Sequence, residues 1–182
     1  MTTVPRGPTA TVTLPTSEEI LITREFAAPR HLVYRAWTTP GLVRRWWGGD
    51  RGEVTSVEID LRVGGRWRYV MTAADGSEAA FHGDYREIVP GERIVCTEVF
   101  ESRPHAQALT TVTFSESGGH TTVAIRVRYG SQQDRDVHSG YMPDGLQEAM
   151  DLLEQAAISL LTGPSGRAGE HPARPRQRGA RR

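Results

Sequence analysis

The chain has 182 residues, which suits one domain and is short for two of ordinary size. All 22 basic residues are Arg, which excludes a lysine nucleophile, and the single cysteine, Cys96, excludes an internal disulfide and a cysteine-rich metal site. No apolar run approaches the roughly 18 residues of a membrane span, and no signal peptide opens the chain, so we expect a cytoplasmic protein without a membrane partner.

The zero net charge divides unevenly along the chain. Residues 163–182 hold six Arg and one acid, so their charge is +5, and residues 1–162 carry −5. This tail has too few apolar residues to form a core, and we expect it to be disordered, with a basic arm for nucleic acid or acidic partners as the alternative. The domain itself carries a net negative charge, which does not favour binding of nucleic-acid phosphates. Residues 1–17, rich in Thr and Pro, predict a flexible leader, which leaves 18–162 as the domain.

The domain opens with a strand and two short helices. In EILITREF (19–26), the residues Ile20, Ile22, Arg24 and Phe26 alternate with Leu21, Thr23 and Glu25, as residues on the two faces of a strand do. Pro29 stands where a first helical residue tolerates proline, and apolar residues follow it at helical spacing. Proline again follows a helix boundary at Thr39 and Pro40, which we expect to be the N-cap and the first residue of a second short helix. Gly48-Gly49 should end this helix.

About six strands follow, separated by turn pairs. Asp75-Gly76, Pro90-Gly91 and Ser117-Gly118-Gly119 are typical turn sequences. Strands that begin every 10–15 residues or so leave no room for crossover helices, so the sheet should be antiparallel. The core face is clear only on the last two strands, where it comprises Val112, Phe114, Val123, Ile125, Val127 and Tyr129.

A long amphipathic helix closes the domain. Ser131 and Asp134 resemble a capping box, and an apolar stripe runs through Met142, Leu146, Ala149, Met150, Leu153, Ala157 and Leu160. Pro143 should kink or restart the helix near Met142, either as a hinged gate or as a harmless break. The element order predicts an α+β fold in which a curved antiparallel sheet wraps around this helix, and the space between them suits a ligand.

Several segments, in order, resemble a known family: APRHLVYRAWTTPGLVRRWWGG, VEIDLRVGGRWRYVM, FHGDYREIVPGERIV and ALTTVTF, then the Gly-Tyr-Met-Pro-Asp-Gly helix segment. They resemble the activator-of-heat-shock-ATPase-like branch of the START-like (SRPBCC) superfamily, over about 20–161. The resemblance implies the helix-grip fold with a cavity between sheet and C-terminal helix. It implies no single activity, since the superfamily includes lipid and polyketide binders, cyclases, hormone receptors and co-chaperones.

The sequence shows no motif for catalysis, a metal or a cofactor. The six His residues form no metal-ligand spacing, and no nucleophile-elbow sequence is present. Cys96 lies in an alternating strand, where a buried thiol is expected. An enzyme, a cyclase or hydrolase on a polyketide-like substrate, would need His82 or Glu98 as its acid or base.

The aromatic residues give the candidate ligand site. Trp46 and Trp47 point about 100° apart on a helix, so one should fill the core while the other faces the cavity mouth. We expect the chain to bind a small hydrophobic or aromatic molecule; the alternatives are the enzyme and a co-chaperone that stimulates a heat-shock ATPase, with a chaperone or a second copy as protein partner. The expected lining residues are Trp47, Trp67, Tyr69, Met71, Phe81, His82, Tyr85, Glu98, Met142, Leu146 and Met150.

Overall fold

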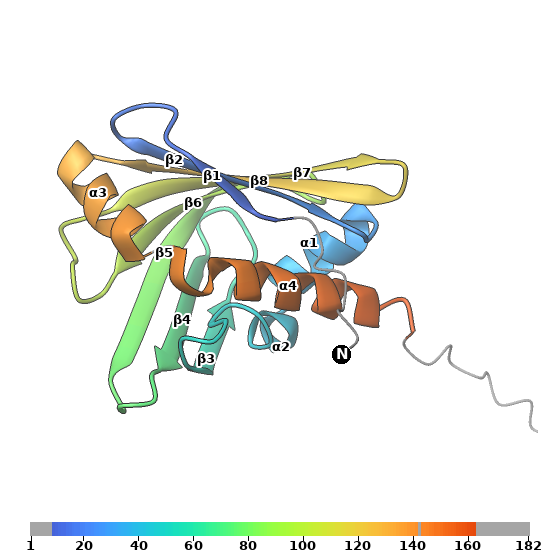
Figure 1. Cartoon of the computed structure of the whole chain (residues 1–182), viewed down its shortest axis with the longest axis horizontal. Coiled ribbons are helices and arrows are strands. Elements are labelled where there is room, and N and C mark those ends of the chain that lie inside the picture. The colour runs from blue at the N-terminus through green and yellow to red at the C-terminus, as the bar shows by residue number, and fades with distance from the viewer. Residues whose placement is uncertain (1–8, 142, 163–182) are drawn as a thin grey trace, which may run out of the picture.

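One strongly curved antiparallel sheet forms most of the molecule (Figure 1). A computed structural model describes residues 9–141 and 143–162. Its strands are β1 (Thr11–Thr13), β2 (Glu19–Phe26), β3 (Glu53–Ile59), β4 (Arg66–Thr72), β5 (Glu78–Val89), β6 (Arg93–Phe100), β7 (Ala108–Ser117) and β8 (His120–Tyr129). Their order across the sheet is β1-β2-β8-β7-β6-β5-β4-β3, and every neighbouring pair is antiparallel, as expected.

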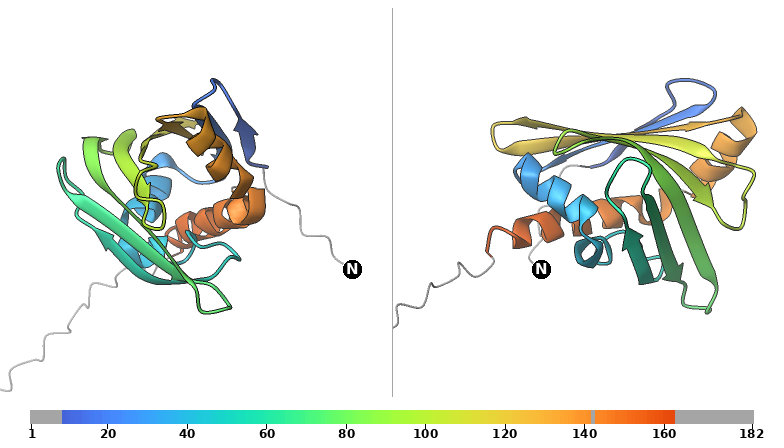
Figure 2. Two further views of the ribbon diagram at one scale, coloured as in Figure 1. Left: turned by 90° about the vertical axis from the view of Figure 1, so that its left-hand side faces the viewer. Right: turned by 180° about the vertical axis from the view of Figure 1, so that it is seen from behind.

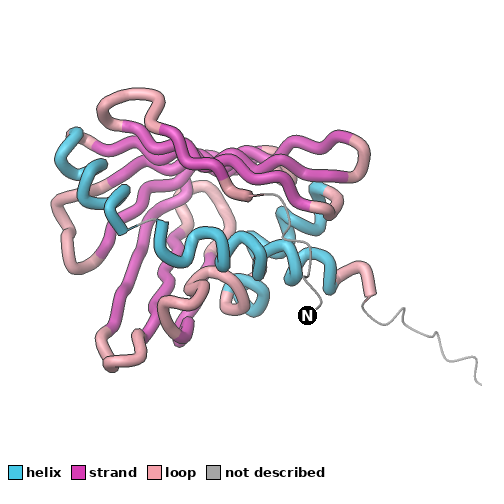
Figure 3. Tube along the Cα trace, in the orientation of Figure 1, coloured by secondary structure: helices cyan, strands magenta, loops and turns pink. Residues whose placement is uncertain are grey.

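The helices gather on the concave side of the sheet (Figure 3). They are α1 (Arg30–Thr38), α2 (Pro40–Val43), α3 (Gln132–Tyr141) and α4 (Pro143–Ser159). The sheet bends so that β3, β4 and β5 run at a steep angle to the direction of the other strands, and α4 lies within that bend (Figure 2). This arrangement confirms the expected helix-grip fold.

Turn residues place the strand connections where the sequence predicts them. Gly76, Gly91, Gly118 and Gly119 all have positive φ, which glycine adopts without strain. Thr39 is the N-cap of α2 and Pro40 its first residue, but α2 ends at Val43, earlier than expected. A series of turns then carries the chain to β3.

The expected leader 1–17 contains a strand. Thr11–Thr13 form β1, which pairs with Leu21–Thr23 of β2 at one edge of the sheet. All three residues are exposed, so pairing with β2 and not burial holds this strand in place. The expectation of a loose leader is therefore wrong for these residues, whereas the expected tail, 163–182, lies outside the described residues.

The core lies between the concave face and the helices. Its fully buried side chains include Ile20, Phe26, Val33, Val43 and Leu153. The face expected for the last two strands is buried at all six positions, from Val112 to Tyr129. The structure describes α3 up to Tyr141 and α4 from Pro143, on either side of the position where proline predicts a break.

Candidate functional site

Glu98 stands on the concave face of the sheet among core residues. On β6 it follows Ile94 and Cys96 at alternate positions, and both of these belong to the buried core. In register, Glu98 pairs with Ala108 of β7, which pairs in turn with Tyr129 of β8. A small alanine therefore separates the carboxyl from the tyrosine along one row of the sheet.

The carboxyl of Glu98 has no compensating charge. It makes no hydrogen bond or ion pair with the described residues, and burial raises its pKa to about 7. Its side chain is nevertheless only half-buried, so some of it is open to small molecules. A carboxyl in such a place holds its proton more tightly than one in water and is unsatisfied when it ionises.

Two hydroxyl groups on the same face are also unsatisfied. The Thr110 and Tyr129 hydroxyl oxygens are buried and have no hydrogen-bond partner among the described residues. Thr110 pairs with Cys96, two residues before Glu98 on the same face, so these polar groups are neighbours. Buried polar groups in native proteins nearly always have partners, and an unpartnered group requires an explanation.

A continuous row of aromatic rings lies beside this polar group. Trp67 contacts Tyr69 at 4.9 Å between ring centroids, and Trp47 meets both Tyr69 and Phe81 edge-on at 5.3 Å. Phe81 stacks on Phe100 at 4.8 Å. Phe100 is two residues after Glu98 on the same strand face, so the row ends next to the carboxyl.

The absence of a side chain at Gly83 leaves room for the indole ring of Trp67. Gly83 follows His82, whose partner is Val99, so it lies opposite Glu98 in the register of β5 and β6. A Cβ atom at Gly83 would lie 1.8 Å from the Thr97 carbonyl oxygen and 2.7 Å from Trp67 Nε1. The indole N–H of Trp67 donates to that same carbonyl at 3.2 Å. Only glycine permits this close approach of Gly83 to the Thr97 carbonyl and the Trp67 indole.

The two adjacent tryptophans have different surroundings, although both lie in the turns after α2 and not on a helix. Trp46 is 4% exposed and donates its indole N–H to the Ala36 carbonyl at 3.0 Å, so it fills the core. Trp47 is only half-buried and joins the aromatic row. The loop that carries it packs against α4 through Gly49, where a Cβ atom would lie 2.8 Å from the Gly145 carbonyl oxygen.

The structure gathers most of the expected lining residues on the concave side. Phe81 and Leu146 are half-buried against the core, and the rest of this group is buried: Trp67, Tyr69, Met71, Tyr85 and Met150. Met142 lies outside the described residues. Phe100, Thr110 and Tyr129 were missed as site residues. Only Phe100 had a usable signal, because it shares the strand face of Glu98 at a spacing of two.

His82 lies on the outer face of the sheet. Its exposed ring places Nδ1 3.1 Å from Glu101 Oε1, and Glu101 also accepts two hydrogen bonds from Arg68. These contacts lower the pKa of Glu101 to about 2, with the Arg68 hydrogen bond as the main cause. The sheet thus separates His82 from Glu98, so His82 does not line the concave face as expected.

A half-buried histidine of α3, His138, lies beside Tyr129. The His138 ring lies 5.4 Å from that of Tyr129, and burial together with nearby Arg51 lowers its pKa to about 4. His138 is therefore neutral at neutral pH and supplies no positive charge. The α3 helix that carries it begins with the expected capping box, in which the Asp134 N–H donates to Ser131 Oγ at 3.2 Å.

Metal and thiol chemistry find little support among residues 9–141 and 143–162. No group of three His, Cys, Asp or Glu side chains there is placed to hold a metal ion. Cys96 is buried, and burial raises the pKa of its thiol to about 12, so the reactive thiolate is scarce. Within the same residues, no helix has both the length and the apolar character that crossing a bilayer requires.

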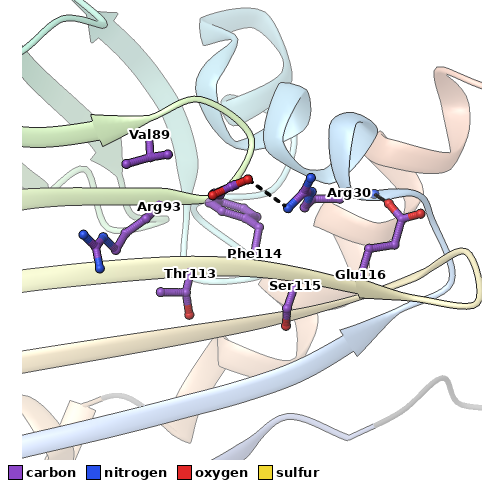
Figure 4. Close-up of a pocket in the computed structure, with 8 residues that line it drawn as sticks. Arg30, Val89, Arg93, Thr113, Phe114, Ser115 and Glu116 are labelled. Atoms are coloured by element: carbon purple, nitrogen blue, oxygen red, sulfur yellow. Dashed lines mark hydrogen bonds and ion pairs between the residues drawn. The ribbon is translucent and has the colours of Figure 1, made fainter.

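An open groove of about 600 Å³ lies away from these residues, where α1 meets the β5–β6 turn and β7 (Figure 4). Its charges are satisfied internally. Arg30 pairs with Glu92 at 3.7 Å, and its backbone N–H donates to the Glu116 carboxylate at 2.6 Å. That carboxylate serves α1 in place of a side-chain cap, which the N-cap residue Pro29 cannot supply. These contacts of the groove's charged residues stabilise the start of α1.

Comparison with known proteins places the chain in a family. The family model described as Activator of Hsp90 ATPase homolog 1-like protein matches residues 27–157. A structure from Rhodobacter sphaeroides aligns with a TM-score of 0.76 at 22% identity, covering 83% of this chain and 99% of that one. One from Chromobacterium violaceum aligns with a TM-score of 0.65 at 28% identity, covering 76% and 96%. No curated protein matches the chain.

A further neighbour agrees with the family match. An AHSA1-like protein from Aeromonas hydrophila aligns with a TM-score of 0.58 at 21% identity, covering 77% of this chain and 93% of that one. The family match spans α1 to α4, and thus nearly the whole described fold. The resemblance seen in the sequence is therefore confirmed, and the chain belongs to the Activator of Hsp90 ATPase homolog 1-like branch of the START-like superfamily.

Proposed function

We propose that the chain binds a small hydrophobic or aromatic molecule on the concave face, between the sheet and α4. One observation carries this proposal: the aromatic row ends at a carboxyl group, Glu98, that has no partner among the described residues. Trp47, Phe81 and Phe100 remain half-buried, although they lie on the face that the helices cover. Partly covered rings beside unsatisfied polar groups are typical of a ligand site, in which apolar walls bind and a few polar groups orient.

Titration with 1-methylnaphthalene, followed by tryptophan fluorescence and calorimetry, tests this proposal. We expect saturable binding that weakens at least tenfold in Trp47→Ala, because this ring joins Tyr69 to Phe81 in the row. Leu109→Ala is the matched control, since Leu109 is 42% exposed and lies on β7 outside the core cluster. Absence of saturable binding, or equal weakening by both variants, would contradict the proposal.

An enzymatic use of the same site is the second candidate. A carboxyl whose pKa is about 7 can both give and take a proton near neutral pH, as a general acid or base must. Glu98 would then act on a bound polyketide-like substrate, as in a cyclase or hydrolase. Mass spectrometry of such a compound incubated with the protein tests this: a mass change that Glu98→Gln abolishes would favour catalysis over simple binding.

Membership of the family supports a third candidate, stimulation of a heat-shock ATPase. The family description concerns proteins like an activator of the Hsp90 ATPase. An ATPase assay with the purified chaperone and this chain tests the role directly. Stimulation that survives in Trp47→Ala would separate a co-chaperone surface from the ligand site.

A further inference from the structure

The lack of a cationic partner for Glu98 among the described residues indicates which polar group the ligand carries. We propose that the molecule bound at this site carries an amino group, whose ammonium form pairs with the Glu98 carboxylate while its apolar or aromatic part lies along the aromatic row. This inference rests on the proposed ligand-binding function and deepens it. Its basis is that Glu98 has no cationic partner among the described residues, while a carboxylate that is half-removed from water is stabilised by one.

The titratable groups that face Glu98 cannot supply that charge. They are Tyr69 from β4, Cys96 from β6 and Tyr129 from β8. Burial raises the pKa of all three, so each is neutral when Glu98 ionises. His138 of α3, which packs on Tyr129, is also neutral at neutral pH because its pKa is lowered to about 4. The buried side of α4 presents apolar residues, among them Met150 and Leu153.

Two arginines lie on the segments around this end of the site. Arg135 of α3 is buried and pairs with Asp136 at 2.8 Å, and it makes no ion pair with Glu98. Arg51 also has contacts elsewhere. Its guanidinium Nε donates to the Gly48 carbonyl at 3.4 Å, and its charge interacts with neighbouring Asp50. Burial lowers the Arg51 pKa, so its surroundings already disfavour the charge. Arg51 makes no ion pair with Glu98, and the carboxyl therefore stays without a counter-ion.

Glu98 and the aromatic rings provide the contacts for an ammonium ion. An ammonium group on a carbon chain has three N–H donors, as in lysine. The Glu98 carboxylate supplies an acceptor for these donors, whereas the Thr110 and Tyr129 hydroxyl oxygens beside it have almost no accessible surface. The faces of the aromatic rings also attract a cation, which a neutral alcohol would not exploit.

Three probes of one shape test the inference: 1-naphthylmethylamine, 1-naphthalenemethanol and 1-methylnaphthalene. Calorimetry at pH 8 measures each against the wild-type chain. We expect the amine to bind at least tenfold more tightly than either neutral probe, a difference of about 1.4 kcal/mol. If all three bind equally, or the alcohol binds best, the inference is wrong while the proposed function stands. If none binds, the proposed function fails, and the inference fails with it.

Glu98→Gln separates the charge from the shape of the site. We expect this variant to lose the tenfold preference for the amine, measured as the ratio of its affinities for 1-naphthylmethylamine and 1-methylnaphthalene. Glu101→Gln is the charge-matched control, because Glu101 pairs with Arg68 and His82 on the outer face. It should keep the preference. Retention of the preference in Glu98→Gln, or its loss in both variants, would overturn the inference.

The preference should also depend on pH. Only ionised Glu98 pairs with an ammonium, so the advantage of the amine should grow as pH rises from 6 to 8 through the raised pKa of Glu98. Binding of 1-methylnaphthalene should stay constant over the same range. An amine preference that is flat across this range in the wild type would show that another group provides it, which contradicts the role of Glu98.

Discussion

Arg24 of β2 and Glu154 of α4 form a buried ion pair, with Nη2 3.0 Å from Oε2, between residues 130 positions apart. The same guanidinium places Nη1 2.7 Å from Asp151 Oδ1, one turn earlier on the helix. Glu154 also accepts the backbone N–H of Ala27, just after β2. Arg24 is only 2% exposed, so this buried network ties the last helix to β2.

Arg24→Met should therefore lower stability strongly. The substitution keeps apolar bulk but leaves two partly buried carboxylates without their cation, which costs about 3 kcal/mol or more. For a domain of this size the melting temperature should fall by roughly 6–12 °C. The control Arg126→Met removes an exposed pair with Glu19 on the same strand pair and should cost less than about 1 kcal/mol. Equal losses in both variants, measured by calorimetry, would show that burial of the network contributes nothing.

Glu98 should make the protein less stable as pH rises. Its pKa is about 7 in the folded protein and lower, near that of free glutamate, in the unfolded chain, so the folded state holds the proton longer. Stability is thus greatest below the unfolded pKa and declines until the pH exceeds about 7, by an amount on the order of 3 kcal/mol.

Glu98→Gln tests this pH dependence, because its amide has the shape of the protonated carboxyl and does not titrate. Urea denaturation should show little difference from the wild type at pH 4.5 and a more stable variant at pH 8. A difference of the same size at both pH values would mean that Glu98 does not titrate with a raised pKa.

Gly83→Ala should disturb both stability and the aromatic row. The added Cβ meets a carbonyl oxygen at 1.8 Å, so the β5–β6 pair must shift or Trp67 must leave its place. Overpacking of this kind costs about 1–3 kcal/mol. Gly41→Ala in α2 is the control, because nothing lies within 4 Å of its added Cβ, and it should be neutral or slightly stabilising. Urea denaturation compares them, and a neutral Gly83→Ala would refute the close packing of Trp67.

Periodicity predicts elements well where one face is apolar and the other polar. β8 shows this alternation and its core face agrees at every expected position, whereas β4 and β6 have apolar residues on both faces, such as Val70 beside Met71. Their inward faces follow only from register, which places Glu98 inside and His82 outside. The pairing of Arg24 with α4 is equally invisible in the sequence, because its partners are more than 120 residues away.

Pro143→Ala tests whether the break between α3 and α4 admits the ligand. Proline cannot donate a backbone hydrogen bond to the carbonyl four residues earlier, and α4 begins at this residue. Alanine restores the donor, so stability should rise by about 1 kcal/mol or less, and stopped-flow exchange of 1-methylnaphthalene should slow more than its affinity changes. Pro40→Ala, at the start of α2, is the control and should leave exchange unaltered. If exchange is unchanged in Pro143→Ala while amide protection around residues 140–145 rises, the break is structural and does not gate the site.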